Sequence, residues 1–389
     1  MFEEETMGKT KAKSNYTVPG VIVRCALLGL LCYYLFWRIF FTLPYHNSVL
    51  EMVLGVLLLI CEFAGLFRLL MLIFNYINFR ESPELMEIYN SDQTVQGFLA
   101  EKGSANVELP DVDVLVTACG EPLEILEKTI RACMHLHYPE KEKVHVHVLD
   151  DGDSAALEKL AKEYGAGYIT RKEHKNAKAG NLNNALRMTN SKLVVVFDAD
   201  MVPHADFLSR TVPHFLAEAN GKWSVDNTKL GFLQTPQAFY TEDLYQSTFR
   251  VGKIVPNEQD QFYRNLQPCK ASKNSVICCG SNAVMLRRAL EEVGYFTENT
   301  ITEDFATGLK IQRAGYSSLA LDRTLAEGTT PDSLRSLIRQ RERWGRGTIQ
   351  TLRQCGLWSR DYTWGQRLNL LASLTPRTRP YHDEPLGRK

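Results

Sequence analysis

Acidic residues follow two short β-branched runs, and this pattern restricts the fold more than any other feature of the chain. The run 145–149 (His-Val-His-Val-Leu) leads into an acidic pair that ends at Asp151, and the run 193–197 (Leu-Val-Val-Val-Phe) leads into Asp198 and Asp200. Runs of this length and composition are typical of strands. Acids at the carboxyl ends of strands lie where open α/β sheets bind ligands. The pattern therefore predicts an α/β enzyme for a charged, metal-bound substrate.

Further strand-like runs alternate with helical spacing along the chain. A buried first strand is expected at 112–118, and later strands are expected at 230–235 and 275–281. The spacing predicts helices over 122–136, 154–164, 179–188, 205–217, 285–293, 305–314 and 331–353. Such alternation predicts βαβ units and a parallel sheet, which is a Rossmann-like nucleotide-binding architecture.

Two apolar segments precede this region. Residues 21–43 and 50–79 are each long enough to cross a bilayer, which takes about 20 apolar residues. A cleaved signal peptide is the alternative for the first segment, but that segment lacks a small-residue cleavage pattern and a second span follows at once. Basic residues lie at the amino-terminal side of the first span, and the connection 44–48 has no Lys or Arg. The positive-inside rule thus predicts a multi-pass protein of the cell membrane with both ends of the hairpin, and the catalytic region, in the cytoplasm.

Charged residues inside the second span are expected to contact protein rather than lipid. Glu62 and Arg68 are such residues, although Arg68 could instead extend toward a helix end. The segment 364–374 is amphipathic, which suits either a membrane-surface helix or a packed surface helix. The tail 375–389 is predicted to be disordered. Basic and acidic residues both number 45 and form no basic stripe, so nucleic acid is not expected as a partner.

Asp198 and Asp200 are candidate metal ligands. Side chains two apart on an extended segment share a face, so both carboxylates could point into one cleft. Oxygen ligands suit Mg²⁺ or Mn²⁺, which complete their coordination with water and substrate phosphates. A diphosphate leaving group would fit such an ion. A solvated loop is the alternative for an isolated Asp-x-Asp.

Three other polar residues are candidates for substrate chemistry. Asp151 could accept hydrogen bonds from a nucleoside, or the acidic pair could cap the helix that begins near Ser154. Lys178 could contact a phosphate, or face solvent. Asp304 could serve as a general base, or Thr302 could be an N-cap whose following acids meet the helix dipole.

A polar and aromatic motif spans 340–344. At 3.6 residues per turn, one broad side of the predicted helix carries Gln340, Arg341, Arg343 and Trp344, while Glu342 points away. Arginines can grip a diphosphate, and an indole can stack on a sugar ring.

With these motifs in view, the chain resembles the processive inverting glycosyltransferases of the cellulose synthase family. The resemblance runs from about Val112 to Gln354 and includes the preceding spans. It is carried by the order of five motifs, 150–152 (Asp-Asp-Gly), 197–200 (Phe-Asp-Ala-Asp), 232–237 (Phe-Leu-Gln-Thr-Pro-Gln), 302–304 (Thr-Glu-Asp) and 340–344 (Gln-Arg-x-Arg-Trp).

The resemblance implies a GT-A type domain that takes a UDP-sugar donor, a glucan acceptor and Mg²⁺ or Mn²⁺. Asp304 matches the catalytic base. Donor contacts are implied for Glu121, Asp151, Lys178, Asp198, Gln340, Arg341 and Arg343. Acceptor contacts are implied for Trp344, Glu303, Gln237 and Ser281, and metal contacts for Asp198 and Asp200. The expected division is 1–20 cytoplasmic, 21–79 membrane, 80–109 linker, 110–355 GT-A domain, and 356–389 amphipathic segment and tail.

The chain departs from the family at its carboxyl end. Family members continue into further transmembrane helices that form a polymer channel, whereas this sequence ends at Lys389. We therefore expect a fragment, a frame-disrupted product or a subunit completed by another synthase chain. Chitin and hyaluronan synthases, which take UDP-N-acetylglucosamine, are the alternative within the enzyme class. A membrane-anchored nucleotide-sugar-binding subunit without useful turnover is the alternative from a different class.

Overall fold

The computed structural model describes residues 18–46, 48–252, 254–356 and 359–374, and the chain divides after Ile88 into two compact units. The first unit consists mainly of α1 (Val18–Phe41) and α2 (Val49–Arg80). Both helices are long and apolar enough to cross a membrane. Ser48 begins α2 by accepting a hydrogen bond from the N–H of Glu51, which satisfies one of the unpaired donors at a helix start.

Polar side chains join α1 to α2. The Glu62 carboxylate accepts hydrogen bonds from Arg38 Nε at 2.8 Å and from the Tyr34 hydroxyl at 3.1 Å. Nearer the other end of the pair, Arg24 donates to Glu81 at 2.6 Å. Glu62 thus faces the neighbouring helix, as the sequence predicts, whereas Arg68 is exposed.

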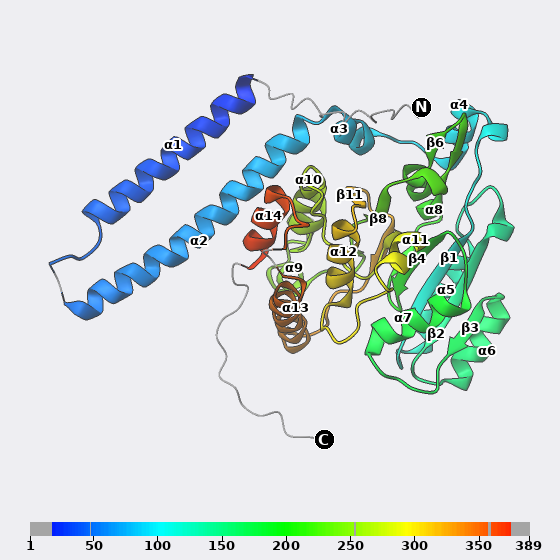
Figure 1. Ribbon diagram of the computed structural model, residues 1–389. Helices are drawn as coiled ribbons and strands as arrows, with labels where there is room; N and C mark the ends of the chain where they lie inside the picture. Colours follow the sequence, from blue (N-terminus) through cyan, green and yellow to red (C-terminus); the bar gives the residue numbers. More distant parts are fainter. Residues whose placement is uncertain (1–17, 47, 253, 357–358, 375–389) are drawn as a thin grey trace. The chain divides into compact units, whose positions relative to one another are not determined.

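The second unit is built around a seven-stranded sheet with the order β11-β8-β10-β4-β1-β2-β3 (Figure 1). The strands are β1 (Val112–Ala118), β2 (Val144–Asp150), β3 (Gly167–Thr170), β4 (Leu193–Asp198), β8 (Leu230–Gln234), β10 (Ala283–Leu286) and β11 (Ser317–Ala320). Only β10 runs antiparallel to its neighbours; the other pairs are parallel. Strands β1 and β4 are almost entirely buried, which explains their mostly apolar sequences, and the buried Asp113 of β1 is paired with Arg287.

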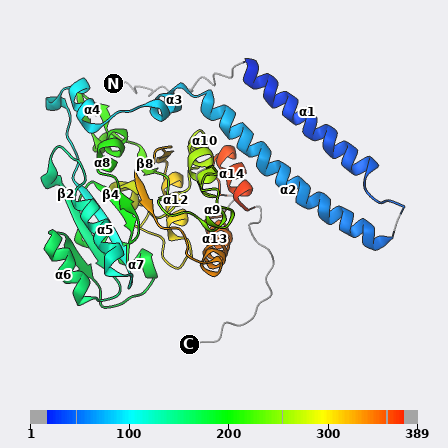
Figure 2. The ribbon, with the colours of Figure 1, turned by 180° about the vertical axis from the view of Figure 1, so that it is seen from behind.

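Helices connect the parallel strands as βαβ units. α5 (Leu123–Met134) joins β1 to β2, α6 (Ala155–Tyr164) joins β2 to β3, and α7 (Ala177–Met188) joins β3 to β4. α5 and α7 both pack against β1 and β2, and Figure 2 shows this region from behind. The sequence predicts these three helices and the strands β1, β2 and β4 correctly.

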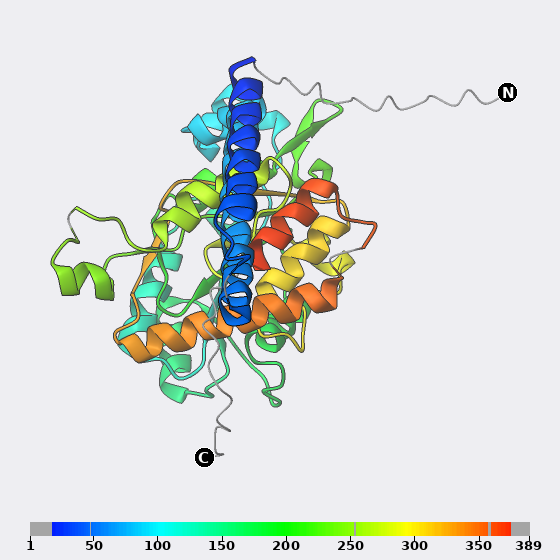
Figure 3. The ribbon, with the colours of Figure 1, turned by 90° about the vertical axis from the view of Figure 1, so that its left-hand side faces the viewer.

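Helices also cover the other half of the unit. They are α11 (Arg287–Glu292), α12 (Glu303–Arg313), α13 (Leu334–Cys355) and α14 (Trp364–Leu374). α12, α13 and α14 lie side by side (Figure 3) and share a core that includes Phe305, Leu352, Tyr362 and Leu370. α14 is therefore a packed helix, which was one of the two interpretations of its amphipathic sequence. The predicted disordered tail lies outside the described residues.

Short elements complete the second unit. Its small sheets contain β5 (Val202–Pro203), β6 (Ala217–Ala219), β7 (Lys222–Ser224), β9 (Ala238–Phe239) and β12 (Ala326–Gly328). Its short helices include α8 (Phe207–Thr211), α9 (Leu244–Phe249) and α10 (Gln267–Ala271). The range 80–109, expected to be a linker, contains α3 (Pro83–Asn90) and α4 (Val95–Lys102). α4 is packed, since the Phe98 ring meets the Trp223 ring edge to face at 5.1 Å.

Two predicted elements are wrong. The helix expected over 205–217 is interrupted, because α8 ends at Thr211 and a 3₁₀ turn containing Pro213 follows. The strand expected over 275–281 is irregular, and the strand β10 begins only at Ala283. Because β10 continues to Leu286, the helix expected over 285–293 begins only at Arg287. Positive φ angles at Gly280 (+76°) and Asn282 (+55°) are incompatible with a continuous strand there.

Candidate active site

The strand order brings the acidic residues to one edge of the sheet. β2 and β4 lie on opposite sides of β1, so the direction of winding reverses at β1. Ala118 pairs with Asp150 across one side, and Thr117 pairs with Asp198 across the other. Open α/β sheets bind ligands at the carboxyl ends of strands beside such a reversal.

The two acids after β2 have different environments. Asp150 is buried and accepts hydrogen bonds from the N–H groups of Gly152 (2.7 Å) and Ser154 (2.8 Å) and from the Tyr168 hydroxyl (2.9 Å). It therefore shapes the turn, while the Ser154 side chain caps α6. Asp151 instead accepts two hydrogen bonds from one edge of the Arg171 guanidinium, from Nε at 2.7 Å and from Nη2 at 2.6 Å.

Glu121 lies on the loop that follows β1. Its carboxylate is exposed and accepts a hydrogen bond from the N–H of Cys119 at 2.6 Å. This loop approaches the turn after β2, because a Cβ added to Gly152 would lie 3.1 Å from the backbone nitrogen of Gly120. The two loops thus lie next to each other at the carboxyl ends of β1 and β2.

Lys178, near the start of α7, reaches the acid at the end of β4. Its Nζ contacts Asp198 Oδ1 and donates to the carbonyl oxygen of Gly280 at 2.7 Å. Burial lowers the pKa of Lys178, but the negative charges of Asp198 and Glu303 outweigh burial, so the pKa lies above its usual value. The side chain therefore carries a fixed positive charge in the site.

Asp198 and Asp200 do not share an extended segment. The prediction that their side chains share one face of such a segment is therefore wrong. β4 ends at Asp198, and the N–H of Met201 donates to the Asp198 carbonyl at 3.1 Å, closing a tight turn. The Asp200 carboxylate accepts a hydrogen bond from Thr329 Oγ1 at 2.9 Å. Burial raises the pKa of Asp200, and the nearby charge of Asp198 raises it further.

This carboxylate pair suits a divalent cation. A cation between the carboxylates would offset the repulsion that raises the Asp200 pKa. Mg²⁺ and Mn²⁺ prefer oxygen ligands and need only one or two carboxylates when a substrate diphosphate is present. Across the described ranges no cluster of three or more His, Cys, Asp or Glu could hold a metal ion, so such an ion would need oxygens from substrate and water.

Asp304 lies in the first turn of α12, against the loop before β10. Burial raises the pKa of Asp304 to about 7, and Glu303 raises it too, while the N–H of Phe305 and the Lys178 charge act in the opposite direction. Thr302 does not cap the helix with its side chain; its hydroxyl bonds the Thr351 hydroxyl at 3.1 Å. Asp304 is therefore a carboxylate poised to exchange a proton near neutral pH.

Gly280 leaves room for Asp304, which gives a first prediction. A Cβ on Gly280 would lie 2.7 Å from Asp304 Oδ2, too close for either atom to stay in place. We expect Gly280→Ala to lower the rate of turnover by roughly 10- to 100-fold if Asp304 takes part in the reaction, because small displacements of reacting groups are costly. The measurement is the steady-state rate of turnover.

Gly294→Ala is the matched control for this variant. Gly294 has a similar positive φ of +82°, yet an added Cβ would meet nothing within 4 Å. Both variants should lose stability on the order of 1 kcal/mol from backbone strain. Equal loss of activity in the two variants would show that strain, and not displacement of Asp304, explains the effect.

α13 packs tightly on the loop that leads to Asp304. A Cβ added to Gly347 would lie 2.4 Å from Thr302 Cγ2, so only glycine permits this approach. Gln350 accepts a hydrogen bond from the N–H of Ile301 at 3.0 Å, and Thr351 bonds Thr302. We call these contacts the α13 clamp. They fix the position of α13 relative to the first turn of α12.

The motif on α13 is only partly gathered on one side. The Arg341 guanidinium lies 4.6 Å from the Trp344 ring centroid and forms an ion pair with Glu258. Gln340 Oε1 is buried and has no hydrogen-bond partner among the residues that the structure describes. Arg343 is exposed and has no ion-pair partner within the same residues. Glu342 is exposed too, as the helical wheel predicts.

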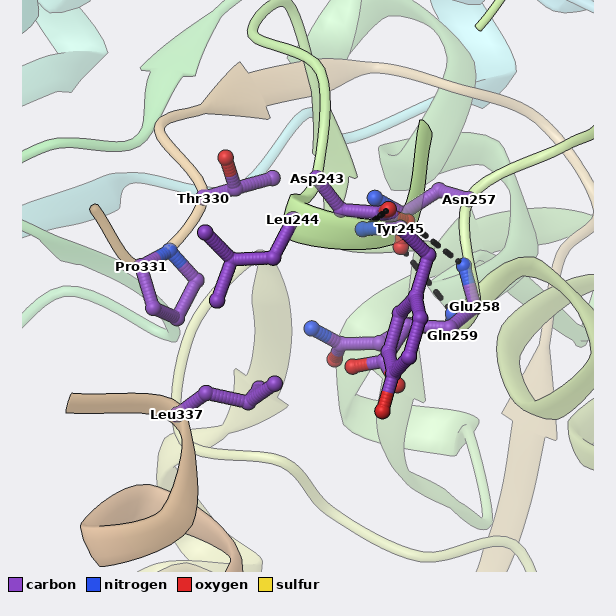
Figure 4. A pocket seen from close by; sticks show the side chains of 9 residues that line it. All are labelled: Asp243, Leu244, Tyr245, Asn257, Glu258, Gln259, Thr330, Pro331 and Leu337. Carbon is purple, nitrogen blue, oxygen red and sulfur yellow. Dashed lines mark hydrogen bonds between the residues drawn. The ribbon is translucent and has the colours of Figure 1, made fainter. Parts of the chain in front are cut away.

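A small hollow is lined in part by Glu258, the residue that forms the ion pair with Arg341. It is lined by Asp243, Leu244, Tyr245, Asn257, Glu258, Gln259, Thr330, Pro331 and Leu337 (Figure 4). Asp243 organises one wall, since its carboxylate accepts hydrogen bonds from the N–H groups of Tyr245 (2.9 Å) and Glu258 (3.1 Å). The lining includes none of the acids at the ends of β2 and β4.

Two predicted acceptor residues lie on segments near the end of β4. Ser281 is buried, and its Oγ accepts a hydrogen bond from the N–H of Asp198 at 2.9 Å. Gln237 donates to the carbonyl oxygen of Cys279 at 3.4 Å. Glu303 is half-buried beside Asp304. Ser281 therefore supports the turn at Asp198 instead of offering a free hydroxyl.

Three contributing residues were not identified from the sequence. Arg171 follows the short strand β3, which the sequence patterns do not reveal. Thr329 and Glu258 bond Asp200 and Arg341 from segments more than 80 residues distant along the chain. The sequence shows an arginine directly after Gly-Tyr-Ile-Thr, but nothing in the sequence indicates which residue it contacts.

A mixed α/β sheet of GT-A type, with acids at its winding reversal and the Asp304 carboxylate beside them, is the arrangement of a glycosyltransferase. The chain belongs to the glycosyltransferase-like family 2, whose model matches residues 110–347. It is 35% identical over 343 residues to cellulose synthase 1 of Komagataeibacter xylinus, covering 88% of this chain and 20% of that protein.

Other relatives agree. The chain is 34% identical over 360 residues to the UDP-forming cellulose synthase catalytic subunit of Pseudomonas fluorescens, covering 90% of this chain. It spans less than half of that relative, 45% of its length. A mannosyltransferase of Pyrobaculum calidifontis, in complex with GDP-Man and Mn²⁺, has the same fold with a TM-score of 0.55 and 18% identity, over 81% of this chain and 80% of that one. The predicted resemblance to cellulose synthases and the predicted fold are thus confirmed.

Proposed function

We propose that the chain transfers glucose from UDP-glucose to the end of a β-glucan and releases UDP, with inversion at the anomeric carbon. One observation carries this proposal: Asp304, with a pKa raised to about 7, lies among Gly280, Lys178 and the acids that end β4. The similarity to UDP-forming cellulose synthase subunits supports both the donor and the acceptor.

In the proposed reaction Asp304 removes the proton from the acceptor hydroxyl. The hydroxyl oxygen then forms a bond to the anomeric carbon while the bond from that carbon to the diphosphate oxygen breaks, so the proton ends on Asp304 and the electron pair on UDP. The positive charge of Lys178 stabilises the negative charge that develops on the diphosphate. Mg²⁺ or Mn²⁺ held by Asp198 and Asp200 would supply further positive charge to the same group.

Residues of α13 and the strand ends would hold the substrates. Asp151 and Glu121 would contact the nucleoside, since they lie on the adjacent loops that follow β2 and β1. Gln340, Arg341 and Arg343 would contact the diphosphate, and Trp344 would stack on the acceptor sugar. Arg341 must exchange its Glu258 partner for phosphate oxygens to do so.

The two apolar helices would anchor the enzyme in the cell membrane. Their length and composition suffice to cross a bilayer, and the charged residues between them face one another. The distribution of basic residues supports a cytoplasmic position for the catalytic unit, where UDP-sugars occur. Further synthase subunits are proposed partners.

The proposal is tested with membranes that contain the chain. Labelled UDP-glucose or UDP-N-acetylglucosamine is supplied with Mg²⁺, Mn²⁺ or a chelator, and released UDP and insoluble β-glucan are both measured. We expect metal-dependent UDP release that is specific for UDP-glucose. Preference for UDP-N-acetylglucosamine would contradict the choice of sugar. Binding of UDP without any transfer would favour a nucleotide-sugar-binding subunit.

The pH dependence of the rate is a second prediction. A general base must be deprotonated, and the pKa of Asp304 is raised to about 7 in the folded protein. We therefore expect kcat/KM to rise about tenfold per pH unit below pH 7 and to level off above it. Saturation already complete at pH 5 would contradict an unusually basic Asp304. The profile is measured from UDP release at fixed ionic strength.

A further inference from the structure

We propose that Arg171 is a positioning residue that couples recognition of the nucleobase to the placement of Lys178. The inference rests on the proposed function, which gives Asp151 and Lys178 their roles toward a UDP-sugar. Arg171 comes directly after β3 and precedes the loop that leads into α7. Its guanidinium contacts both Asp151, after β2, and the loop between β3 and α7.

One side of the guanidinium fixes the Asp151 carboxylate. Arg171 Nε lies 2.7 Å from Asp151 Oδ1 and Nη2 lies 2.6 Å from Oδ2, and each side chain is only 8% exposed. A fork of this kind is charge-assisted and fixes the plane of the carboxylate. An ionised carboxylate can only accept hydrogen bonds, and lone pairs remain on both oxygens. It therefore suits a base that presents a ring N–H, as uracil does. Cytosine has a bare nitrogen at that ring position, which would repel the carboxylate, and could donate only from its neighbouring amino group.

The same guanidinium also holds the loop after β3. Nη1 donates to the carbonyl oxygen of Lys175 at 2.5 Å, and Nη2 donates to that of Ala177 at 2.9 Å. Asn176 and Ala177 have φ angles of +62° and +42°, a region that alanine in particular rarely adopts. Such strained backbone persists only where its surroundings fix it. A Cβ at Gly180 would lie 2.3 Å from Nη1, so the guanidinium is closely enclosed.

Lys178 follows this loop at once. Because Ala177 is bonded to Arg171, the backbone immediately before Lys178 is tied to the carboxylate that would contact the base. Lys178 in turn contacts Asp198 and the carbonyl of Gly280. A lysine at position 171 would keep the charge, but a single ammonium cannot reproduce a planar fork that serves four acceptor atoms.

Arg171→Lys tests the inference, with Lys175→Ala as control. Lys175 lies on the same loop with a side chain that is 79% exposed, and its replacement leaves the backbone carbonyl in place. UDP and CDP compete against labelled UDP-glucose, and the ratio of their inhibition constants is measured. We expect Arg171→Lys to raise the KM for UDP-glucose about tenfold and to reduce the preference for UDP over CDP, with Lys175→Ala unchanged. The ratio does not depend on how much of the protein is folded.

The inference would be overturned if the Arg171→Lys protein kept the wild-type KM and UDP preference and lost only thermal stability. That result would leave the proposed function intact. A wild-type chain that transfers no glucose from UDP-glucose would overturn the proposed function, and the inference with it. A wild type that transfers glucose but is inhibited equally by UDP and CDP would overturn the inference alone. If Arg171→Lys does not fold, amide hydrogen exchange of the wild type decides. UDP should slow exchange over residues 176–180, and CDP should slow it less. Equal exchange with and without UDP would overturn the coupling.

Discussion

Asp304→Asn is expected to lower the transfer rate by orders of magnitude while leaving donor binding intact. The amide keeps the size of the side chain and its place against Gly280, but it cannot take up a proton from the acceptor hydroxyl. General-base catalysis typically contributes about 10²- to 10⁴-fold to a rate, so we expect a loss in that range. The assay compares UDP release and labelled β-glucan from membranes that contain either protein.

The affinity for UDP separates this result from a damaged site. Asp304 lies in the first turn of α12, while the residues expected to hold the nucleoside lie after β1 and β2, so Asp304→Asn should bind UDP as the wild type does. Glu303→Gln is the matched control, because it removes the neighbouring acid of the same turn. Transfer that survives in Asp304→Asn and disappears in Glu303→Gln would assign the proton to Glu303.

Asp198→Asn is expected to have the second largest effect. The Asp198 carboxylate contacts Lys178 and is one of two candidate metal ligands. Its replacement by an amide therefore removes a negative charge from the Lys178 contact and from the candidate metal site. We expect transfer to fall by roughly 10²- to 10³-fold, since charge stabilisation at a leaving group is worth several kcal/mol. The remaining rate should respond weakly to Mg²⁺ or Mn²⁺. Rate against metal concentration is the measurement.

Asp206→Asn is a suitable control for Asp198→Asn. Asp206 is also part of an ion pair, with Arg210, but it comes at the start of α8 and contacts none of the site residues. Its replacement should leave metal dependence unchanged. If Asp198→Asn shows the same metal dependence as the wild type, Asp198 is not a ligand and the ion must be bound elsewhere.

Local patterns suffice for the parallel half of the sheet. The strands β1 and β4 are mostly apolar because both of their faces are buried, and β2 begins as an alternation of valine and histidine and ends in buried residues. The helices between them show regular spacing and recognisable starts such as Ser154. The convergence of the acids at one edge then follows from the βαβ topology itself. For this reason the nucleotide-binding architecture could be predicted without any structure.

The second half was less predictable because its backbone departs from regular geometry. The run 275–281 is apolar and resembles a strand, yet Gly280 and Asn282 adopt positive φ, so pairing begins only at Ala283. Sequence spacing likewise treated Asp198 and Asp200 as neighbours on an extended segment, whereas the chain turns between them. A single sequence does not show where a backbone leaves the strand conformation.

The partners of the site residues could not be predicted either. Arg171 bonds Asp151 across 20 residues, and Arg341 bonds Glu258 across 83. Spacing identifies which residues share a face of one helix or strand, but not which residue on another element meets them. The charges of the site were therefore visible in the sequence, while the pairing that sets their chemistry was not.

The α13 clamp has a consequence for how a bound sugar nucleotide is protected from hydrolysis. Gly347 and Thr351 pack on Thr302 in the loop before α12, so a shift of α13 that keeps these contacts carries the turn of Asp304 with it. A shift of this kind that admits or releases a nucleotide would withdraw the Asp304 carboxylate at the same moment. An open enzyme would then be unable to activate stray water against a bound sugar nucleotide, and wasteful hydrolysis would be suppressed without a separate lid.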